Sequence, residues 1–397
     1  MDRTEQNVYD KLSKKLASFS QGFPETERGV EVKILKKLFT EEQAEIYLQI
    51  SSKYPHIPIP GKPTSKRLQK KLKMNYDKLS KKMEEMAQQG LLFRQKFDSK
   101  PNEPFYLPPP FVVGLYEFSL KNMDEELASL CHDYIKDIAD WWNRIPTKQL
   151  RVIPIKNSIK TEKSVWPYDK IDEIIKDHSV ISVSDCICGK EKMMLGQQCK
   201  GPLERCITFD WFAEHYIDTG IGRKINEQEL KEILVTAEKR GLVISPSNMK
   251  DSIGFCLCCD CCCTWLRIIG SDPKPAMQVE ASYHAEIDQA KCNQCNICST
   301  RCNMSAITKV NAFSIDLDRC IGCGLCVTTC PQKAIQMVRN GRTFKLEKSA
   351  HQLFMKMHEE HLKANSFKYS KIKKFIALLQ IKIARAILNI PELFKKF

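Results

Sequence analysis

CNQCNICSTRC at residues 292–302 and CIGCGLCVTTC at residues 320–330 share one cysteine spacing, C-x2-C-x2-C-x3-C. In such runs the first three thiolates hold one iron–sulfur cube and the fourth thiolate reaches the other cube. A cube has four iron corners, and each corner takes one thiolate. We therefore predict two [4Fe–4S] clusters with crossed ligands: Cys292, Cys295, Cys298 and Cys330 on one, and Cys320, Cys323, Cys326 and Cys302 on the other.

The residues around the two runs support this interpretation. Gly322 and Gly324 let the backbone approach a cluster closely, because glycine has no Cβ. Pro331 follows the second run, whereas Asn303 stands where proline is usual after the first. Structural zinc sites commonly use two pairs of ligands, which does not match four cysteines in eleven residues, twice over.

Composition limits the class of protein. The chain has 397 residues and nineteen cysteines, so it is too long for the two runs alone. Its first residues, MDRTEQNVYD, do not resemble a secretory signal, and it has no run of eighteen apolar residues. We therefore expect a cytoplasmic protein whose cysteines bind metal. The formal charge of +14 permits a nucleic acid, an anionic membrane or an acidic protein as partner.

The organisation predicted from the sequence is an α+β multidomain chain. Its four parts are a winged helix-turn-helix-like domain over 1–120, a mixed α/β cysteine-rich domain over 121–280, a bacterial-type double 4Fe–4S ferredoxin-like domain over 281–342, and a basic amphipathic helical tail over 343–397.

The first part shows the element order of a winged helix. Thr40, followed by two glutamates, begins one helix, and Pro63 and Thr64 begin a short one. A longer helix, with apolar residues at helical spacing from Tyr76, ends at Gly90. LLFRQKF and EPFYL then alternate as a β-hairpin does.

Charge in this region raises the question of DNA binding. Between Lys62 and Lys100, twelve Lys or Arg stand against four Asp or Glu, which suits phosphate contacts. Side chains suited to reading bases are scarce, with Asn75 and Gln89 at the ends of the presumed recognition helix. We expect at most weak, salt-sensitive and sequence-independent DNA binding, and a solvated or protein-docking face is the simpler interpretation.

The middle part combines helices, strands and a first group of cysteines. A helix is expected over 123–145, with Cys131 in its apolar stripe as a core residue, and strands over 149–155 and 179–185. The next cysteines follow C-x-C-x10-C-x6-C. Structural zinc and a third [4Fe–4S] cluster both fit them, and the iron–sulfur runs elsewhere favour a cluster. They are Cys186, Cys188, Cys199 and Cys206.

The segment FCLCCDCCCTW, residues 255–265, is the most unusual. One cube cannot use six neighbouring thiolates, because successive side chains of an extended segment point to opposite faces. We expect either a division between two centres, one of them completing the group that begins at Cys186, or a redox-active thiol cluster. The six candidate ligands are Cys256, Cys258, Cys259, Cys261, Cys262 and Cys263.

Taken together, these motifs resemble a largely uncharacterised family of 4Fe–4S binding proteins from anaerobic bacteria and archaea. The likeness covers about residues 5–340. It rests on the cysteine segments and on GFPETERGVE, GLLFR, PFVVG and PLERC, at residues 22–31, 90–94, 110–114 and 202–206. It implies iron–sulfur electron transfer with no known substrate.

Two functions remain open. An electron carrier, or an electron-transfer subunit of an oxidoreductase, needs several clusters in sequence, whereas a redox-sensing regulator that binds DNA needs one labile cluster. The ten further clustered cysteines favour the carrier. A catalytic open-site cluster around residues 256–263 is a weaker alternative, and the lone His132 and His284 are expected to be structural.

The last part of the chain is both basic and apolar. SKIKKFIALLQIKIARAILNIPELFKKF, residues 370–397, has an apolar helical face flanked by lysine and arginine. Such a helix suits an anionic membrane surface, a partner's groove or packing against the protein itself. The double run is also basic, so we expect a redox partner with an acidic docking surface, and peripheral membrane contact through the tail.

Removal of residues 366–397 should leave the clusters intact and release the protein from its membrane or partner complex. Co-sedimentation of the full-length and truncated chains with anionic vesicles and with cell membranes measures this. Equal solubility of both forms, with cluster loss in the truncated one, would show that the tail is a structural element of the fold.

Overall fold

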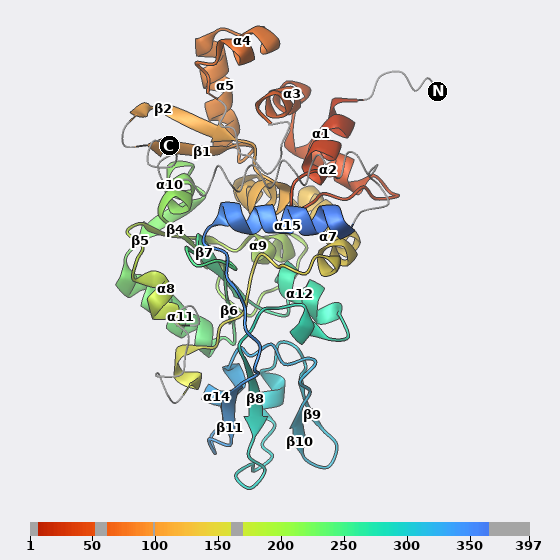
Figure 1. Cartoon of the computed structure of the whole chain (residues 1–397), viewed down its shortest axis with the longest axis vertical. Helices are drawn as coiled ribbons and strands as arrows, with labels where there is room; N and C mark the ends of the chain where they lie inside the picture. The colour runs from red at the N-terminus through yellow and green to blue at the C-terminus, as the bar shows by residue number, and fades with distance from the viewer. Residues whose placement is uncertain (1–6, 52–61, 98–99, 160–169, 365–397) are drawn as a thin grey trace. The chain divides into compact units, whose positions relative to one another are not determined.

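The computed structural model describes residues 7–51, 62–97, 100–159 and 170–364. Within it the chain forms two compact units, one of residues 1–147 and 351–397 and one of residues 148–350 (Figure 1). The expected helix over 123–145 belongs to the first unit, although the sequence assigned it to the middle part. The basic apolar segment at 370–397 lies outside the described residues.

The first unit is mainly helical. Its helices are α1 (Val8–Ala17), α2 (Val30–Leu38), α3 (Glu41–Ile50), α4 (Lys66–Leu72), α5 (Tyr76–Gln88), α6 (Tyr116–Phe118), α7 (Glu125–Arg144) and α15 (Ala350–Ala364). Strands β1 (Phe93–Phe97) and β2 (Lys100–Leu107) form an antiparallel hairpin. The helix start at Thr40 is confirmed, because its hydroxyl accepts from the amide of Gln43 in a capping box.

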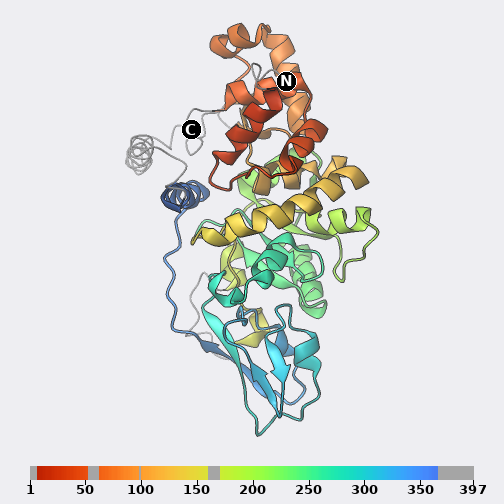
Figure 2. The same ribbon diagram turned by 90° about the vertical axis from the view of Figure 1, so that its right-hand side faces the viewer.

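Aromatic side chains organise the core of this unit. Phe23 lies 4.7 Å from Phe111 and 5.0 Å from Tyr134, measured between ring centroids. Trp141 of α7 contacts His361 of α15 at 5.1 Å, so α15 lies beside α7, as Figure 2 shows with α15 seen nearly end-on. Cys131 is 2% exposed within α7, which confirms that it is a core residue. The winged-helix interpretation of α3 to β2 stays a prediction.

The second unit contains a five-stranded antiparallel sheet in the order β5-β3-β4-β7-β6. Its strands are β3 (Ile181–Asp185), β4 (Glu204–Phe209), β5 (Gly222–Ile225), β6 (Val243–Pro246) and β7 (Gly254–Cys258). The helices around it are α8 (Ile171–Ile175), α9 (Ile187–Met194), α10 (Asp210–Asp218), α11 (Glu227–Lys239) and α12 (Thr264–Ser271). The strand expected at 149–155 is reduced to isolated bridges from Leu150 and Ile153.

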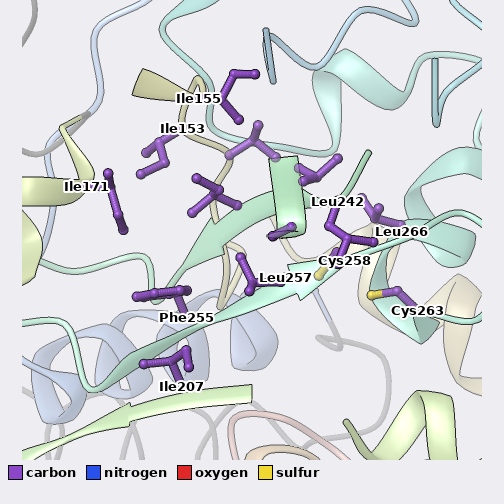
Figure 3. Close-up of a cluster of buried hydrophobic side chains, with 14 of the residues drawn as sticks. Ile153, Ile155, Ile171, Ile207, Leu242, Phe255, Leu257, Cys258, Cys263 and Leu266 are labelled. Atoms are coloured by element: carbon purple, nitrogen blue, oxygen red, sulfur yellow. The ribbon is translucent and has the colours of Figure 1, made fainter. Parts of the chain in front are cut away.

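Alternation along β7 separates apolar side chains from thiols. Phe255 and Leu257 pack with Ile207 in the buried core that Figure 3 displays. Cys256 points to the opposite face, and it is the direct cross-strand partner of Cys206 in β4. The sheet thus places two cysteines from distant segments side by side.

Two small sheets follow in the same unit. β8 (Tyr283–Ile287) pairs with β11 (Ile335–Arg339), and β9 (Ile307–Lys309) pairs with β10 (Phe313–Ile315). The short helices α13 (Ile297–Thr300) and α14 (Leu325–Thr328) each follow the first two cysteines of a run. No helix of the described residues is long and apolar enough to cross a membrane.

The two cysteine runs adopt the same backbone conformation. Gln294 and Asn296 of the first run have φ of 57° and 66°, and Gly322 and Gly324 at the equivalent places have 69° and 75°. A Cβ at Gly322 would stand 2.1 Å from the carbonyl oxygen of Tyr283. The second run therefore needs glycine there both for its left-handed backbone and for a close backbone contact.

Candidate metal centres

Two pockets in the ferredoxin-like part bring the eight repeat cysteines together in fours. The inner pocket is lined by Cys302, Cys320, Cys323 and Cys326, and the outer pocket by Cys292, Cys295, Cys298 and Cys330. In each pocket three thiols come from one run and the fourth comes from the other. This is the arrangement that crossed ligation requires.

Backbone amides in both pockets point at the crossing thiols. The amide of Ala306 donates to Cys302 Sγ at 3.2 Å, and the amide of Ala334 donates to Cys330 Sγ at the same distance. Burial raises the pKa of Cys323 to about 12. A buried thiolate at that position therefore needs a cation, and iron supplies one.

The pockets differ in their access to solvent. The inner pocket adjoins the core of the five-stranded sheet, against which Cys302, Cys320 and Cys323 pack. In the outer pocket Cys295 is exposed. The inner pocket is therefore the one next to the other cysteines, and the outer pocket is the one next to solvent.

The middle cysteines divide into two groups, and the division differs from the sequence prediction. Cys199 does not lie with Cys186, Cys188 and Cys206. The cause is the loop after α9, which carries Cys199 away from the strand and helix that hold the other three. The thiols of Cys199, Cys259, Cys261 and Cys262, here named the four-thiol group, all lie within 4.8 Å of one another.

The other six thiols form a closed circuit, here named the six-thiol ring. Each thiol lies close enough to the next to shift its pKa, in the order Cys186, Cys188, Cys263, Cys258, Cys256, Cys206. Charge interaction between Cys206 and Cys186 closes the circuit. Figure 3 shows two members of this ring, Cys258 and Cys263, beside Leu242 and Leu266 of the core. Residues 256–263 are thus shared between two groups, which is one of the two arrangements that the sequence left open. Alternation does not assign the four cysteines after Cys258, because β7 ends there and a turn and the start of α12 follow.

Two helix N-termini face the six-thiol ring. Cys186 precedes α9 and Cys263 precedes α12, each as the capping residue. The amide of Thr264 donates to Cys188 Sγ at 3.5 Å. The positive ends of helix dipoles and free amides stabilise thiolates. Interaction with the neighbouring thiols of Cys188 and Cys258 lowers the pKa of Cys263 to about 6.

Arg205, which the cysteine spacing does not single out, lies between the two groups. Its side chain is 1% exposed, and its Nη2 donates to Cys262 Sγ at 3.0 Å. Burial alone would lower the pKa of Arg205, but the negative charges of Cys186, Cys259 and Cys262 outweigh burial and raise it. An arginine next to a cysteine in a strand with buried apolar residues was the available signal, since a buried cation needs an anionic partner.

Asn303, noted in the sequence only as a departure from proline, joins the ferredoxin-like part to the four-thiol group. Its amide nitrogen donates to the carbonyl of Gly241 at 2.9 Å. Its Oδ1 accepts from the backbone amide of Asp260 at 3.1 Å and from Lys200 Nζ at 2.8 Å. Asp260 lies between Cys259 and Cys261, and Asn303 follows Cys302 directly. One buried side chain therefore connects the inner pocket to the four-thiol group.

Comparison with known proteins agrees with this geometry. The family model of the 4Fe-4S binding domain matches residues 313–336, which contain the four cysteines of the second run. No curated protein and no solved structure is significantly similar to the chain. The chain thus contains a 4Fe–4S binding domain, which supports an iron–sulfur electron-transfer role.

Asn303→Ala should weaken the attachment of the ferredoxin-like part. The substitution leaves a buried carbonyl and a buried amide without their partner, at a cost of about 2–4 kcal/mol. The expected result is a lower melting temperature and faster proteolysis near residues 241 and 260. Asn293→Ala, at an exposed position of the same run, is the control. Equal melting temperatures for both variants would contradict a role for Asn303 in this attachment.

Proposed function

We propose that this chain is an iron–sulfur electron carrier, or the electron-transfer subunit of a redox complex, with two crossed [4Fe–4S] clusters and a further iron–sulfur centre in the six-thiol ring. The observation that carries the proposal is the pair of ferredoxin pockets, each lined by three thiols of one run and one of the other. When bound, such clusters transfer single electrons.

The arrangement of the thiols supports a sequence of centres. Cys326 of the inner pocket is close enough to Cys298 of the outer pocket for their charges to interact, so the two pockets are neighbours. Cys323 of the inner pocket packs on the same apolar core as Cys258 and Cys263 of the six-thiol ring. Its carbonyl also accepts from the amide of Ile155 at 3.1 Å. Close-packed protein thus connects the outer pocket, the inner pocket and the ring.

Transfer of electrons is favoured over catalysis by the number of ligands. Each ferredoxin pocket supplies four thiols, one for each corner of a cube, which leaves no iron corner for a substrate. In the ring the six thiols are buried or half-buried, and helix N-termini compensate their charge. These features stabilise a cluster that stays in place while electrons pass.

The outer pocket is the proposed place of exchange with a partner. Cys295 and the neighbouring Ile297 are exposed, and Lys333, whose amide donates to the carbonyl of Cys330, is exposed as well. An apolar contact beside a positive charge suits a partner with an acidic rim. Contact with an anionic membrane through residues 366–397 remains part of the proposal, and those residues lie outside the described part of the chain.

DNA binding is not favoured by the side chains of the first unit. Lys82 lies 2.9 Å and Lys78 3.8 Å from the carboxylate of Glu42. Both lysines are on α5, the presumed recognition helix, and a carboxylate between them repels phosphate. A tight complex with one promoter sequence that depends on cluster oxidation would support the regulator instead of the carrier.

Crossed ligation is tested by comparing four variants under anaerobic conditions. Cys330→Ala and Cys298→Ala should alter the same EPR signal, because their thiols line the outer pocket. Cys302→Ala and Cys320→Ala should alter the other signal. Each variant is expected to lose up to about four irons. If Cys330→Ala instead reproduces the spectrum of Cys320→Ala, the ligands are not crossed.

The centre in the ring is tested by Cys258→Ser. Wild-type protein should contain iron and sulfide beyond the about eight of each that two cubes require. Cys258→Ser should remove this excess and leave both ferredoxin EPR signals, because Cys258 lines neither ferredoxin pocket. Cys131→Ser, which changes a buried thiol of the first unit, is the control. An iron content of about eight in wild type would exclude this centre.

A further inference from the structure

We propose that the four-thiol group of Cys199, Cys259, Cys261 and Cys262 binds a single tetrahedral zinc ion, separate from every iron–sulfur centre. The proposal does not depend on the electron-transfer function. It starts from the distances between the four sulfur atoms.

The four sulfur atoms are close together. Cys259 and Cys262 are 2.9 Å apart, and Cys199 is 3.0 Å from Cys262, 3.5 Å from Cys259 and 3.7 Å from Cys261. Four thiolates on one zinc ion stand about 3.8 Å apart, because each tetrahedral Zn–S bond is about 2.3 Å long. A small outward movement of the side chains therefore admits one ion.

A cube does not fit this spacing. Its four thiolates bind four different irons at the outer corners, so their sulfur atoms stand much further apart than ligands of one ion. The ferredoxin pockets provide an internal comparison. Among the described residues, the four-thiol group is the one set of three or more His, Cys, Asp or Glu whose ligand atoms all lie within 4.8 Å. The eight ferredoxin cysteines are spread around open pockets instead.

Arg205 is a second and independent indication of a bound anionic centre. Its guanidinium is buried and donates through Nη2 to Cys262, whereas Nη1 and Nε have no hydrogen-bond partner among the described residues. Gly201 makes room for it, since a Cβ there would stand 2.4 Å from Nη1. A buried cation needs compensating negative charge. Zinc with four thiolates carries a net charge of minus two and supplies it.

The ligand chemistry selects zinc over iron. Four thiolates in a tetrahedron suit zinc or iron–sulfur chemistry, and the spacing excludes the cube. Between single divalent ions, zinc binds such a site more tightly than iron(II). Zinc is also redox-inactive, so the ion joins the loop after α9 to the turn before α12 without adding a step for electrons.

The test is metal analysis of the full-length chain purified anaerobically. Wild type should contain about one zinc per chain, and X-ray absorption at the zinc edge should show four sulfur ligands at about 2.3 Å. Cys199→Ser and Cys261→Ser should each lose the zinc and keep the iron, the sulfide and the ferredoxin EPR signals. Cys131→Ser should keep everything.

Cys261 is the exposed member of the group, so its replacement disturbs packing least. If Cys199→Ser does not fold, Cys261→Ser and the absorption spectrum of wild type still decide the matter. Loss of iron and sulfide from Cys261→Ser would place a cluster in the group and overturn the proposal. Wild-type protein without zinc, or zinc bound by nitrogen or oxygen, would overturn it as well.

Discussion

Antiparallel pairing of β4 with β7 is the constraint on which the cysteine-rich unit depends. Cys206 and Cys256 are direct partners across these strands, and each neighbouring position points to the opposite face. Phe255 and Leu257 are buried in the apolar core, and the half-buried Cys256 points to the other face of the sheet, where it lies beside Cys206. A shift of one residue in this register would exchange the faces on which the thiol and the apolar side chains lie. The loop that carries Cys199 leads into β4, and the turn that carries Cys259, Cys261 and Cys262 follows β7, so this pairing also sets their positions.

Charge compensation explains how so many thiols can lie close together. The six-thiol ring receives the N-termini of α9 and α12, and the guanidinium of Arg205 lies between the two groups, where it donates to Cys262 and interacts with Cys186. The helix N-termini compensate thiolate charge through backbone dipoles, and Arg205 does so with a full positive charge. Both stabilise thiolates before any metal binds, and both are built from residues next to the cysteines in the sequence. Residues close in sequence to the cysteines thus supply the positive charge, and the sheet brings the six-thiol ring and the four-thiol group close to each other.

The ferredoxin-like part shows how one backbone design serves two different sequences. The left-handed positions are occupied by Gln294 and Asn296 in the first run and by two glycines in the second. The second run needs glycine because the backbone of Tyr283 approaches Gly322 closely. The first run is followed by Asn303, whose side chain makes hydrogen bonds that a proline could not make. The two runs therefore differ at positions where they contact the rest of the unit.

Much of the chemistry follows from spacing in the sequence alone. Three cysteines separated by two residues each can wrap around one centre and the fourth can reach the other, so the spacing of Cys292 to Cys330 indicated clusters before any fold was known. Helix signals near Thr40 and in α5 are local as well, because capping and periodicity act within a few residues. What spacing could not decide is which distant thiols meet. Cys199 is nearer in sequence to Cys206 than to Cys262, yet it lies 3.0 Å from Cys262. Strand pairing and the loop after α9 determine that contact, and only the tertiary structure contains them.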